Sequence, residues 1–168
     1  GSWWKILMID LGEQIMMQNI KAVAFDLDGT IYYGNQVAEG AIETIDFLKS
    51  RNLKVVYFTN NSVNTRQQIY EKLCMLGLVL DISDVYSSSY ASGSYLKEQG
   101  LNRVYCLGSD GLKWQLESQG ITLSNGKSDL DAILVGLDKE FSYDKLADAL
   151  KAYRPGIKLL ACNLDKSY

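Results

Sequence analysis

Two carboxylates stand two residues apart directly after an apolar run, in the stretch 21–30 (KAVAFDLDGT). The run before them is short, apolar and partly aromatic, which predicts a buried β-strand. Alternation along a strand returns every second side chain to the same side, so Asp26 and Asp28 can converge beyond the strand end. Gly29 allows the chain to turn sharply there. Since ligands of open α/β sheets bind at the carboxyl ends of the strands, we expect this pair to face a ligand.

A second polar cluster follows the next predicted strand, residues 54–58 (KVVYF). Thr59, Asn60 and Asn61 come directly after it. If the two strands are neighbours in a parallel sheet, both clusters face one crevice. Hydroxyl, amide and backbone N–H groups there can hold phosphoryl oxygens, and we include Gly29 among these predicted substrate-binding residues.

Paired carboxylates beside such a cluster suit phosphoryl transfer. A carboxylate can attack phosphorus and form an aspartyl-phosphate, and we predict Asp26 as this nucleophile. A second carboxyl can protonate the leaving alkoxide and then take a proton from water, the role we predict for Asp28. Two neighbouring acids repel each other, so we also predict that both bind a hard divalent cation, most simply Mg²⁺.

The composition excludes several other kinds of chemistry. The chain has no histidine, which removes imidazole bases, Ser-His-Asp and Cys-His nucleophiles and histidine metal sites. Lys and Arg number 17 against 20 Asp and Glu, and no basic run occurs, so neither nucleic acid nor an anionic membrane is expected as a partner. No apolar run approaches the ~20 residues of a membrane span. The expected partner is a small soluble substrate.

Cysteine usage bears on the compartment. The three cysteines, Cys74, Cys106 and Cys162, are far apart and stand among apolar residues. Their odd number and spacing suit reduced core thiols better than disulfides or a zinc site. We therefore expect a cytoplasmic protein.

The predicted elements alternate between strands and helices, which is typical of an α/β fold with parallel pairing and right-handed crossovers. A polar cluster at 87–89 predicts a hinge, and we expect a domain boundary near 87–91. Residues 31–36 predict a short loop or hairpin, and 124–131 an exposed connection. The predicted helices cover about 40–50, 66–76, 90–99, 111–119 and 143–153, and the later strands 85–86, 103–107, 132–135 and 158–162.

The motifs resemble those of the haloacid dehalogenase superfamily of phosphatases. Residues 25–30 (FDLDGT) are similar to its first motif and 58–62 (FTNNS) to its second. Three further stretches are similar to the subfamily with a large type IIA cap, which includes NagD-like nucleotide, nitrophenyl, pyridoxal and phosphoglycolate phosphatases. These stretches are 104–112 (VYCLGSDGL), 135–143 (VGLDKEFSY) and 161–165 (ACNLD).

The resemblance implies a three-layer Rossmann-like core with an inserted α/β cap. Residues 1–18 are then a tag or leader, 19–89 the N-terminal half of the core and 90–168 most of the cap. It gives Asp26 and Asp28 the roles stated above, with the Asp28 backbone carbonyl also on the metal, and matches Thr59 and Asn60 to the phosphoryl-binding pair. The implied activity is Mg²⁺-dependent hydrolysis of a small phosphorylated metabolite, of the nucleotide, sugar phosphate, pyridoxal phosphate or phosphoglycolate type. Caps of this group often contribute to dimers, so a homodimer is left open.

The chain departs from the family pattern at its far end. Family members continue with a second half of the core, which supplies a lysine and an acidic motif, whereas Asp165 and Lys166 do not stand in matching contexts. The alternative is therefore a truncated, catalytically incomplete chain that at most binds Mg²⁺ or phosphate. A phospho-accepting receiver domain ranks lower, because its aspartate ends a mid-chain strand. Tyr143 and Asn163 could face a substrate, but packing and capping are plainer roles for both.

Overall fold

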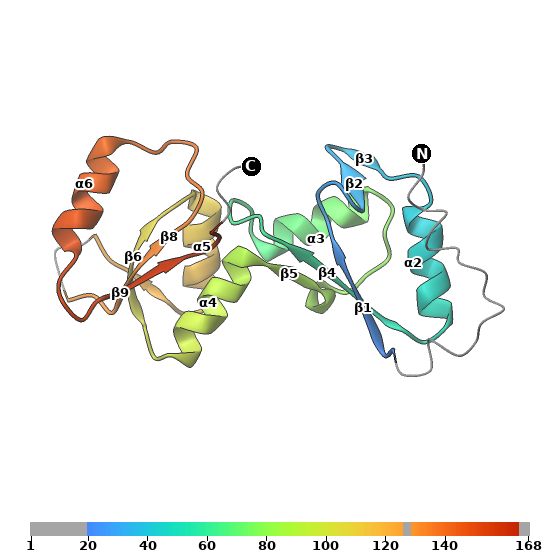
Figure 1. Cartoon of the computed structure of the whole chain (residues 1–168), viewed down its shortest axis with the longest axis horizontal. Helices are drawn as coiled ribbons and strands as arrows, with labels where there is room; N and C mark the ends of the chain where they lie inside the picture. The colour runs from blue at the N-terminus through green and yellow to red at the C-terminus, as the bar shows by residue number, and fades with distance from the viewer. Residues whose placement is uncertain (1–19, 126–128, 165–168) are drawn as a thin grey trace.

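The computed structural model describes residues 20–125 and 129–164. They form two lobes, each built on its own parallel sheet (Figure 1). We call residues 20–87 the first lobe and the described residues from 88 onward the second lobe. The predictions on residues 1–18, on Asp165 and Lys166 and on part of 124–131 lie outside the described residues.

The first lobe contains a three-stranded sheet in the order β1-β4-β5, and all of its pairs are parallel. Its strands are β1 (Ala22–Asp26), β4 (Lys54–Thr59) and β5 (Val85–Ser87), and its helices are α2 (Ala41–Ser50) and α3 (Arg66–Met75). A small antiparallel hairpin, β2 (Tyr32–Tyr33) with β3 (Gln36–Val37), follows β1, and a 3₁₀ turn, η1 (Ile82–Asp84), precedes β5. The predicted strand–helix alternation is confirmed here.

The core of the first lobe lies between this sheet and its helices. Helix α2 buries Ala41, Ile45 and Leu48, the stripe that its helical spacing predicts. Helix α3 starts with a capping box at Thr65 and buries Ile69 and Leu73. Both stripes join one apolar cluster with the inward side chains of the strands.

The second lobe contains a four-stranded sheet in the order β7-β6-β8-β9, again with parallel pairs only. Its strands are β6 (Arg103–Leu107), β7 (Thr122–Leu123), β8 (Ala132–Val135) and β9 (Lys158–Ala161), and its helices are α4 (Ser88–Glu98), α5 (Asp110–Ser118) and α6 (Tyr143–Ala152). Figure 1 shows α6 on one side of this sheet and α4 and α5 on the other. The apolar core of the lobe includes Leu96, Leu112 and Leu116.

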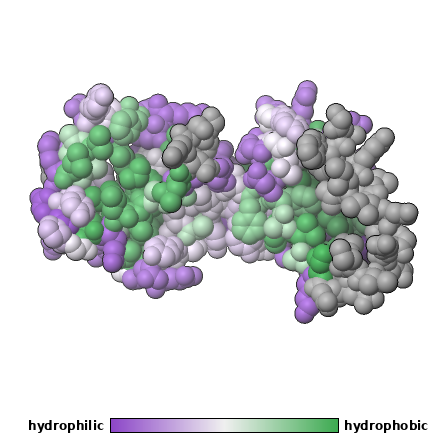
Figure 2. Space-filling model, in the orientation of Figure 1, coloured by the Kyte–Doolittle hydropathy of each residue, from purple (hydrophilic) through white to green (hydrophobic). Residues whose placement is uncertain are grey.

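Strand β9 is an edge strand, because it pairs only with β8 among the described residues. Its Leu159 is 66% exposed. Figure 2 shows apolar surface on the face of the second lobe where β9 lies. Among the described helices, none is both long and apolar enough to cross a lipid bilayer.

Two expectations on local structure are wrong. The helix predicted from residue 90 begins earlier: Ser87 ends β5 and caps α4, which starts at Ser88. Ser87 and Ser89 are buried and hydrogen-bonded to each other (2.9 Å), so the strand continues directly into the helix. Cys74 is exposed, because it lies on the outer side of α3, whereas Cys106 and Cys162 are partly buried; all three thiols are free.

Candidate active site

The two acids of the first motif lie at the carboxyl end of β1. Asp26 is the last residue of the strand, and the isolated bridge to Tyr32 keeps the chain extended at Asp28. Leu27 between them is fully buried, while both acids are exposed. The strand alternation therefore holds through the end of β1, and the two carboxylates lie on its solvent side.

The turn after these acids depends on Gly29, whose φ of +81° lies in the left-handed region. Its N–H donates to the Tyr32 carbonyl (2.8 Å), and the Leu27 carbonyl accepts from the amides of residues 30, 31 and 32. The Gly29 amide thus supports the turn in this structure. Its role as a phosphate ligand stays a prediction.

The second motif lies directly beside the first. Strand β4 pairs with β1 in the register Asp26 to Phe58, so Thr59 follows one residue beyond the end of the pairing. The Thr59 hydroxyl is 3.5 Å from Asp28 Oδ2, to which it donates a long hydrogen bond. Two motifs 31 residues apart in sequence therefore meet at the edge of one sheet.

Hydrogen bonds of Asn61 stabilise the loop after β4. The Asn61 N–H donates to the Thr59 hydroxyl oxygen (3.1 Å), and Asn61 Oδ1 accepts from the amides of Val63 (2.8 Å) and Asn64 (3.1 Å). This side chain has a structural role that the sequence reading did not anticipate. Asn60 is exposed, and its backbone carbonyl accepts a hydrogen bond from the Ser88 hydroxyl (2.8 Å). Direct phosphate contacts by Asn60 and Asn61 stay predictions.

Tyr32 is a site residue that the sequence reading missed. It is buried, and the Lys72 ammonium lies 3.8 Å from the centre of its ring. Burial raises the pKa of Tyr32, and the Asp28 charge, a hydrogen bond to Asp28 and the Asp26 charge raise it further. The phenol is therefore a neutral donor toward the carboxylates. The sequence places Tyr32 in the predicted 31–36 hairpin. It does not predict the strand register of that hairpin, which turns the Tyr32 side chain inward.

Asp26 and Asp28 suit a hard cation, because they offer exposed carboxylate oxygens at one strand end. Within the described residues, no group of three or more acidic, cysteine or histidine side chains is arranged to hold a metal ion. The two aspartates therefore fit part of an Mg²⁺ coordination shell, the rest of which would come from water, substrate oxygens or other residues.

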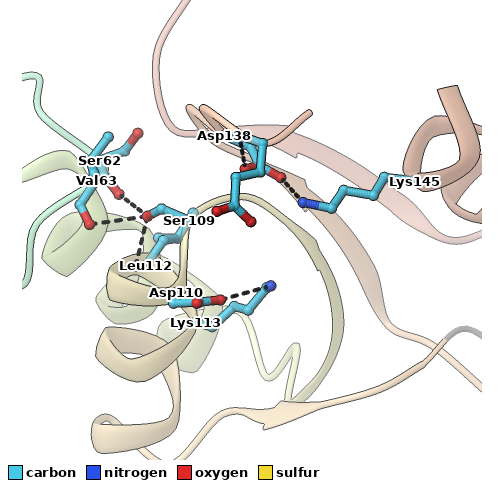
Figure 3. Close-up of polar contacts among 9 residues, drawn as sticks. Ser62, Val63, Ser109, Asp110, Leu112, Lys113, Asp138 and Lys145 are labelled. Carbon is cyan, nitrogen blue, oxygen red and sulfur yellow. Dashed lines mark hydrogen bonds and ion pairs between the residues drawn. The ribbon is translucent and has the colours of Figure 1, made fainter. Parts of the chain in front are cut away.

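A small cavity of about 150 Å³ lies where the second lobe meets the loop after β4, and Val63 is part of its wall. Two ion pairs border it: Lys113 with Asp110 (3.2 Å) and Lys145 with Asp138 (2.8 Å) (Figure 3). Burial of the Asp138 carboxyl acts to raise its pKa, but hydrogen bonds from Lys145 and the Glu140 amide outweigh this and lower the pKa. Tyr143 is not among the lining residues and is 86% exposed.

Comparison with known proteins shows which family the chain resembles. The sequence profile of the haloacid dehalogenase-like hydrolases matches residues 23–122, which include both motifs and the start of the second lobe. The chain belongs to the haloacid dehalogenase-like hydrolases. The family predicted from the two motifs is thereby confirmed, and so is the Rossmann-like α/β fold.

Relatives within this haloacid dehalogenase-like family are phosphatases by name. The chain is 36% identical over 152 residues to an acid sugar phosphatase of Staphylococcus saprophyticus, and the match covers 90% of this chain and 58% of that relative. The chain thus spans little more than half the length of the curated relatives it matches.

Solved structures agree with this assignment. A 4-nitrophenylphosphatase from Thermotoga maritima superposes with a TM-score of 0.80 at 30% identity, covering 87% of this chain and 56% of that one. NagD from E. coli K-12 superposes with a TM-score of 0.77 at 26% identity, covering 86% and 57%. The predicted similarity to NagD and nitrophenyl phosphatases is confirmed.

Proposed function

We propose that this haloacid dehalogenase-like chain provides the nucleophile, the acid/base and the phosphate-binding loop of a Mg²⁺-dependent phosphomonoester hydrolase. The observation that supports this most is the meeting of the two motifs: the Thr59 hydroxyl lies 3.5 Å from Asp28, and Asp26 ends the neighbouring strand. A nucleophile, a proton donor and a phosphate-binding hydroxyl are thereby gathered at one strand edge.

The first chemical step is attack of an Asp26 carboxylate oxygen on the phosphorus of the ester. A new P–O bond forms as the ester P–O bond breaks, and Asp28 gives its proton to the leaving oxygen. In the second step Asp28 takes a proton from water, which attacks the aspartyl-phosphate, releases inorganic phosphate and regenerates the Asp26 carboxylate.

The surrounding groups hold the phosphoryl oxygens and the acid/base. Thr59 and Asn60 bind the phosphoryl group from the end of β4, and Tyr32 donates a hydrogen bond to Asp28, which orients that carboxyl. Mg²⁺ would be held by the Asp26 carboxylate and the Asp28 backbone carbonyl, and it would neutralise part of the phosphate charge while the Asp28 carboxyl stays free to carry its proton.

The substrate we propose is a small phosphorylated metabolite. Among the classes left open by the sequence, a sugar phosphate comes first, because the curated relatives are named acid sugar phosphatases. We propose that residues 19–89 act as the core half and 90–168 as a substrate-selecting cap. A cytoplasmic location and a homodimer formed through the exposed apolar edge at β9 belong to the same proposal.

The test is hydrolysis of a chromogenic phosphate ester with Mg²⁺ by the chain and by Asp26→Asn. The proposal expects turnover that falls at least about a thousandfold in Asp26→Asn, because the nucleophile is lost. Asp46→Asn is the matched control, since Asp46 is an exposed acid on α2 and should keep wild-type turnover.

The second candidate is a catalytically incomplete chain that binds only Mg²⁺ or phosphate. It is favoured by the two-acid site, because within the described residues no group of three or more acidic, cysteine or histidine side chains is arranged to hold a metal ion. Absence of turnover in the wild-type chain, together with measurable phosphate binding, would support this candidate over the hydrolase.

A further inference from the structure

The loop 60–64, which follows the phosphate-binding strand, is held by serine hydroxyl groups. Four of its backbone carbonyls accept hydrogen bonds from them: Ser88 donates to Asn60 (2.8 Å), Ser89 to Asn64 (3.0 Å), and Ser109 to Val63 (3.0 Å) with a longer contact to Ser62 (3.4 Å). Two of these serines begin α4, and the third precedes α5. The loop that follows Thr59 therefore depends on the second lobe for its carbonyl partners.

Ser109 has two roles at once. Its hydroxyl oxygen accepts from the Leu112 N–H (3.1 Å) and so caps α5, while the hydroxyl donates to the Val63 carbonyl oxygen (3.0 Å) (Figure 3). A helix cap needs only the first contact. The second crosses between the lobes and reaches a loop 46 residues earlier in the chain.

Contacts also run between the lobes through other groups. The Leu137 N–H, just after β8, donates to the Ser62 hydroxyl (3.1 Å), and Ser62 is fully buried. At the start of α3 the Arg66 N–H donates to Oε1 of Gln115 (2.9 Å), a buried side chain of α5. Buried polar groups paired in this way resist separation, because parting them leaves donors and acceptors unsatisfied.

Gly111 allows the close approach of the lobes. A Cβ atom at this position would lie 2.1 Å from the Val63 carbonyl oxygen, a backbone atom that cannot move without moving the loop. Any larger residue at 111 must therefore displace the loop from α5. The second lobe and the loop fit together with no spare space at this point.

We propose that the second lobe positions the phosphate-binding loop, and that Ser109 is the positioning residue at the centre of this contact. The Ser109 hydroxyl and Gly111 fix Val63, and through the Asn61 side chain and the Thr59 hydroxyl they fix the end of β4. This proposal rests on the proposed function, which assigns phosphate binding to the loop. It makes the second lobe part of the phosphate site rather than a body joined to it by a free hinge.

The first test is amide hydrogen exchange in the chain, compared between wild type, Ser109→Ala, Ser109→Thr and Ser142→Ala. Ser142 is the matched control, since it caps α6 through the Lys145 amide. We expect Ser109→Ala to speed exchange at Asn61, Val63 and Asn64 by up to about tenfold, and Ser109→Thr to restore slow exchange because it keeps the hydroxyl. Ser142→Ala should leave the loop unchanged.

A merely capping role for Ser109 gives a different pattern. Exchange would then rise at Leu112 in α5 while the loop amides kept their wild-type rates, and this result would overturn the proposal. Gly111→Ala provides a second variant, because it displaces Val63 and leaves the Ser109 cap in place. It should speed exchange of the same loop amides.

The second test is titration with inorganic phosphate in the presence of Mg²⁺. The proposal expects several-fold weaker binding in Ser109→Ala, wild-type affinity in Ser142→Ala and recovery in Ser109→Thr. If the wild type binds phosphate and Ser109→Ala binds it with the same affinity, the positioning role is contradicted but the proposed function is not. Absence of phosphate binding in the wild type contradicts the proposed function and the positioning role together, although the exchange result would still establish the contact between the lobes.

Discussion

Both lobes have acids at or after the ends of parallel strands, and the surroundings of these acids differ. In the first lobe Asp26 and Asp28 follow a parallel strand and are exposed. In the second, Asp138 follows parallel strand β8, its side chain is only 7% exposed, and it pairs with Lys145 of the next helix, α6. Asp110 starts α5 and pairs with Lys113 of the same helix, but its side chain is fully exposed. Among the described residues the salt bridges involve neither Asp26 nor Asp28.

This difference supports the proposal that Asp26 and Asp28 of the first lobe take part in chemistry, whereas the Asp138–Lys145 pair has a structural role. A carboxylate held by a lysine has lost much of its ability to attack phosphorus or to bind a cation, since the ammonium already neutralises it. Within the described part of the chain no ammonium group forms an ion pair with Asp26 or Asp28, and Asp28 accepts hydrogen bonds from the hydroxyl groups of Thr59 and Tyr32 instead. The neighbouring side chains thus distinguish the nearly buried, lysine-paired Asp138 from the exposed Asp26 and Asp28.

After Asp26→Asn, which removes the nucleophile, the largest loss of turnover is expected from Asp28→Asn. The amide keeps the shape but has no proton to give, so turnover of an alkyl phosphate should fall by about 10²- to 10⁴-fold. The loss should be smaller for 4-nitrophenyl phosphate, whose leaving group needs little protonation. Steady-state rates on the two esters measure this difference.

Asp138→Asn is the control from the other lobe. It should change turnover on both esters by a similar, small factor, because Asp138 is paired with Lys145. A dependence on the leaving group in Asp138→Asn, or its absence in Asp28→Asn, would contradict the assigned roles.

Thr59→Val is expected to have an intermediate effect. The change keeps the side-chain shape, removes the donor to Asp28 and removes a hydroxyl from the phosphate site. Hydrogen bonds to charged groups contribute roughly 1.5–3 kcal/mol, so the affinity for inorganic phosphate should weaken by about ten- to a hundredfold. Titration with phosphate in the presence of Mg²⁺ measures the change.

The control for Thr59 is Thr122→Val, an exposed threonine in β7. It should leave phosphate affinity unchanged. Wild-type affinity in Thr59→Val would remove Thr59 from the predicted site.

The smallest effect is expected on the acid stability of the second lobe. The pKa of Asp138 is lowered in the folded chain, so its contribution is present above the unfolded value of about 3.9 and is lost as the pH falls through the folded value. Lys145→Met removes the partner of Asp138. The free energy of unfolding should then depend less steeply on pH in the acid range, which we call the acid limb. The pH dependence of the free energy of unfolding, from urea titrations between about pH 2 and 7, measures it.

Lys151→Met is the matched variant, because its partner Asp148 is 60% exposed, whereas the Asp138 side chain is only 7% exposed. Exposed pairs are screened by solvent, so Lys151→Met should leave the acid limb as in wild type. Equal acid limbs in wild type and Lys145→Met would contradict the stabilising role of the Asp138–Lys145 pair.

The sequence predicted structure best where apolar residues recur with the period of a strand or a helix. The alternation through Leu27 predicts that the flanking acids share one side, and the buried Leu27 with its two exposed neighbours agrees with this. The stripe Ala41, Ile45 and Leu48 predicted the buried face of α2 for the same reason. Local periodicity is a property of the chain itself, so it can be read without the fold.

Features that depend on tertiary contacts were not readable. Strand β7 is only two residues long and exists because it pairs with β6. The serines at 87–89 resemble a polar hinge in sequence, yet Ser87 and Ser89 are buried, where they bond to each other and Ser89 bonds to the loop 60–64. Tyr32 and the second role of Ser109 depend on partners distant in sequence or on a hairpin register, which composition and spacing do not encode.

The most direct test of the central claim is chemical trapping of the phosphorylated carboxylate. Brief reaction of the chain with a phosphate ester and Mg²⁺, followed by borohydride reduction, converts an aspartyl-phosphate to homoserine, which peptide mass spectrometry can locate. We predict homoserine at position 26 in the wild type, none at Asp28, and none in Asp26→Asn. Turnover without modification at position 26, or modification at Asp28 instead, would contradict the assignment of Asp26 as the nucleophile.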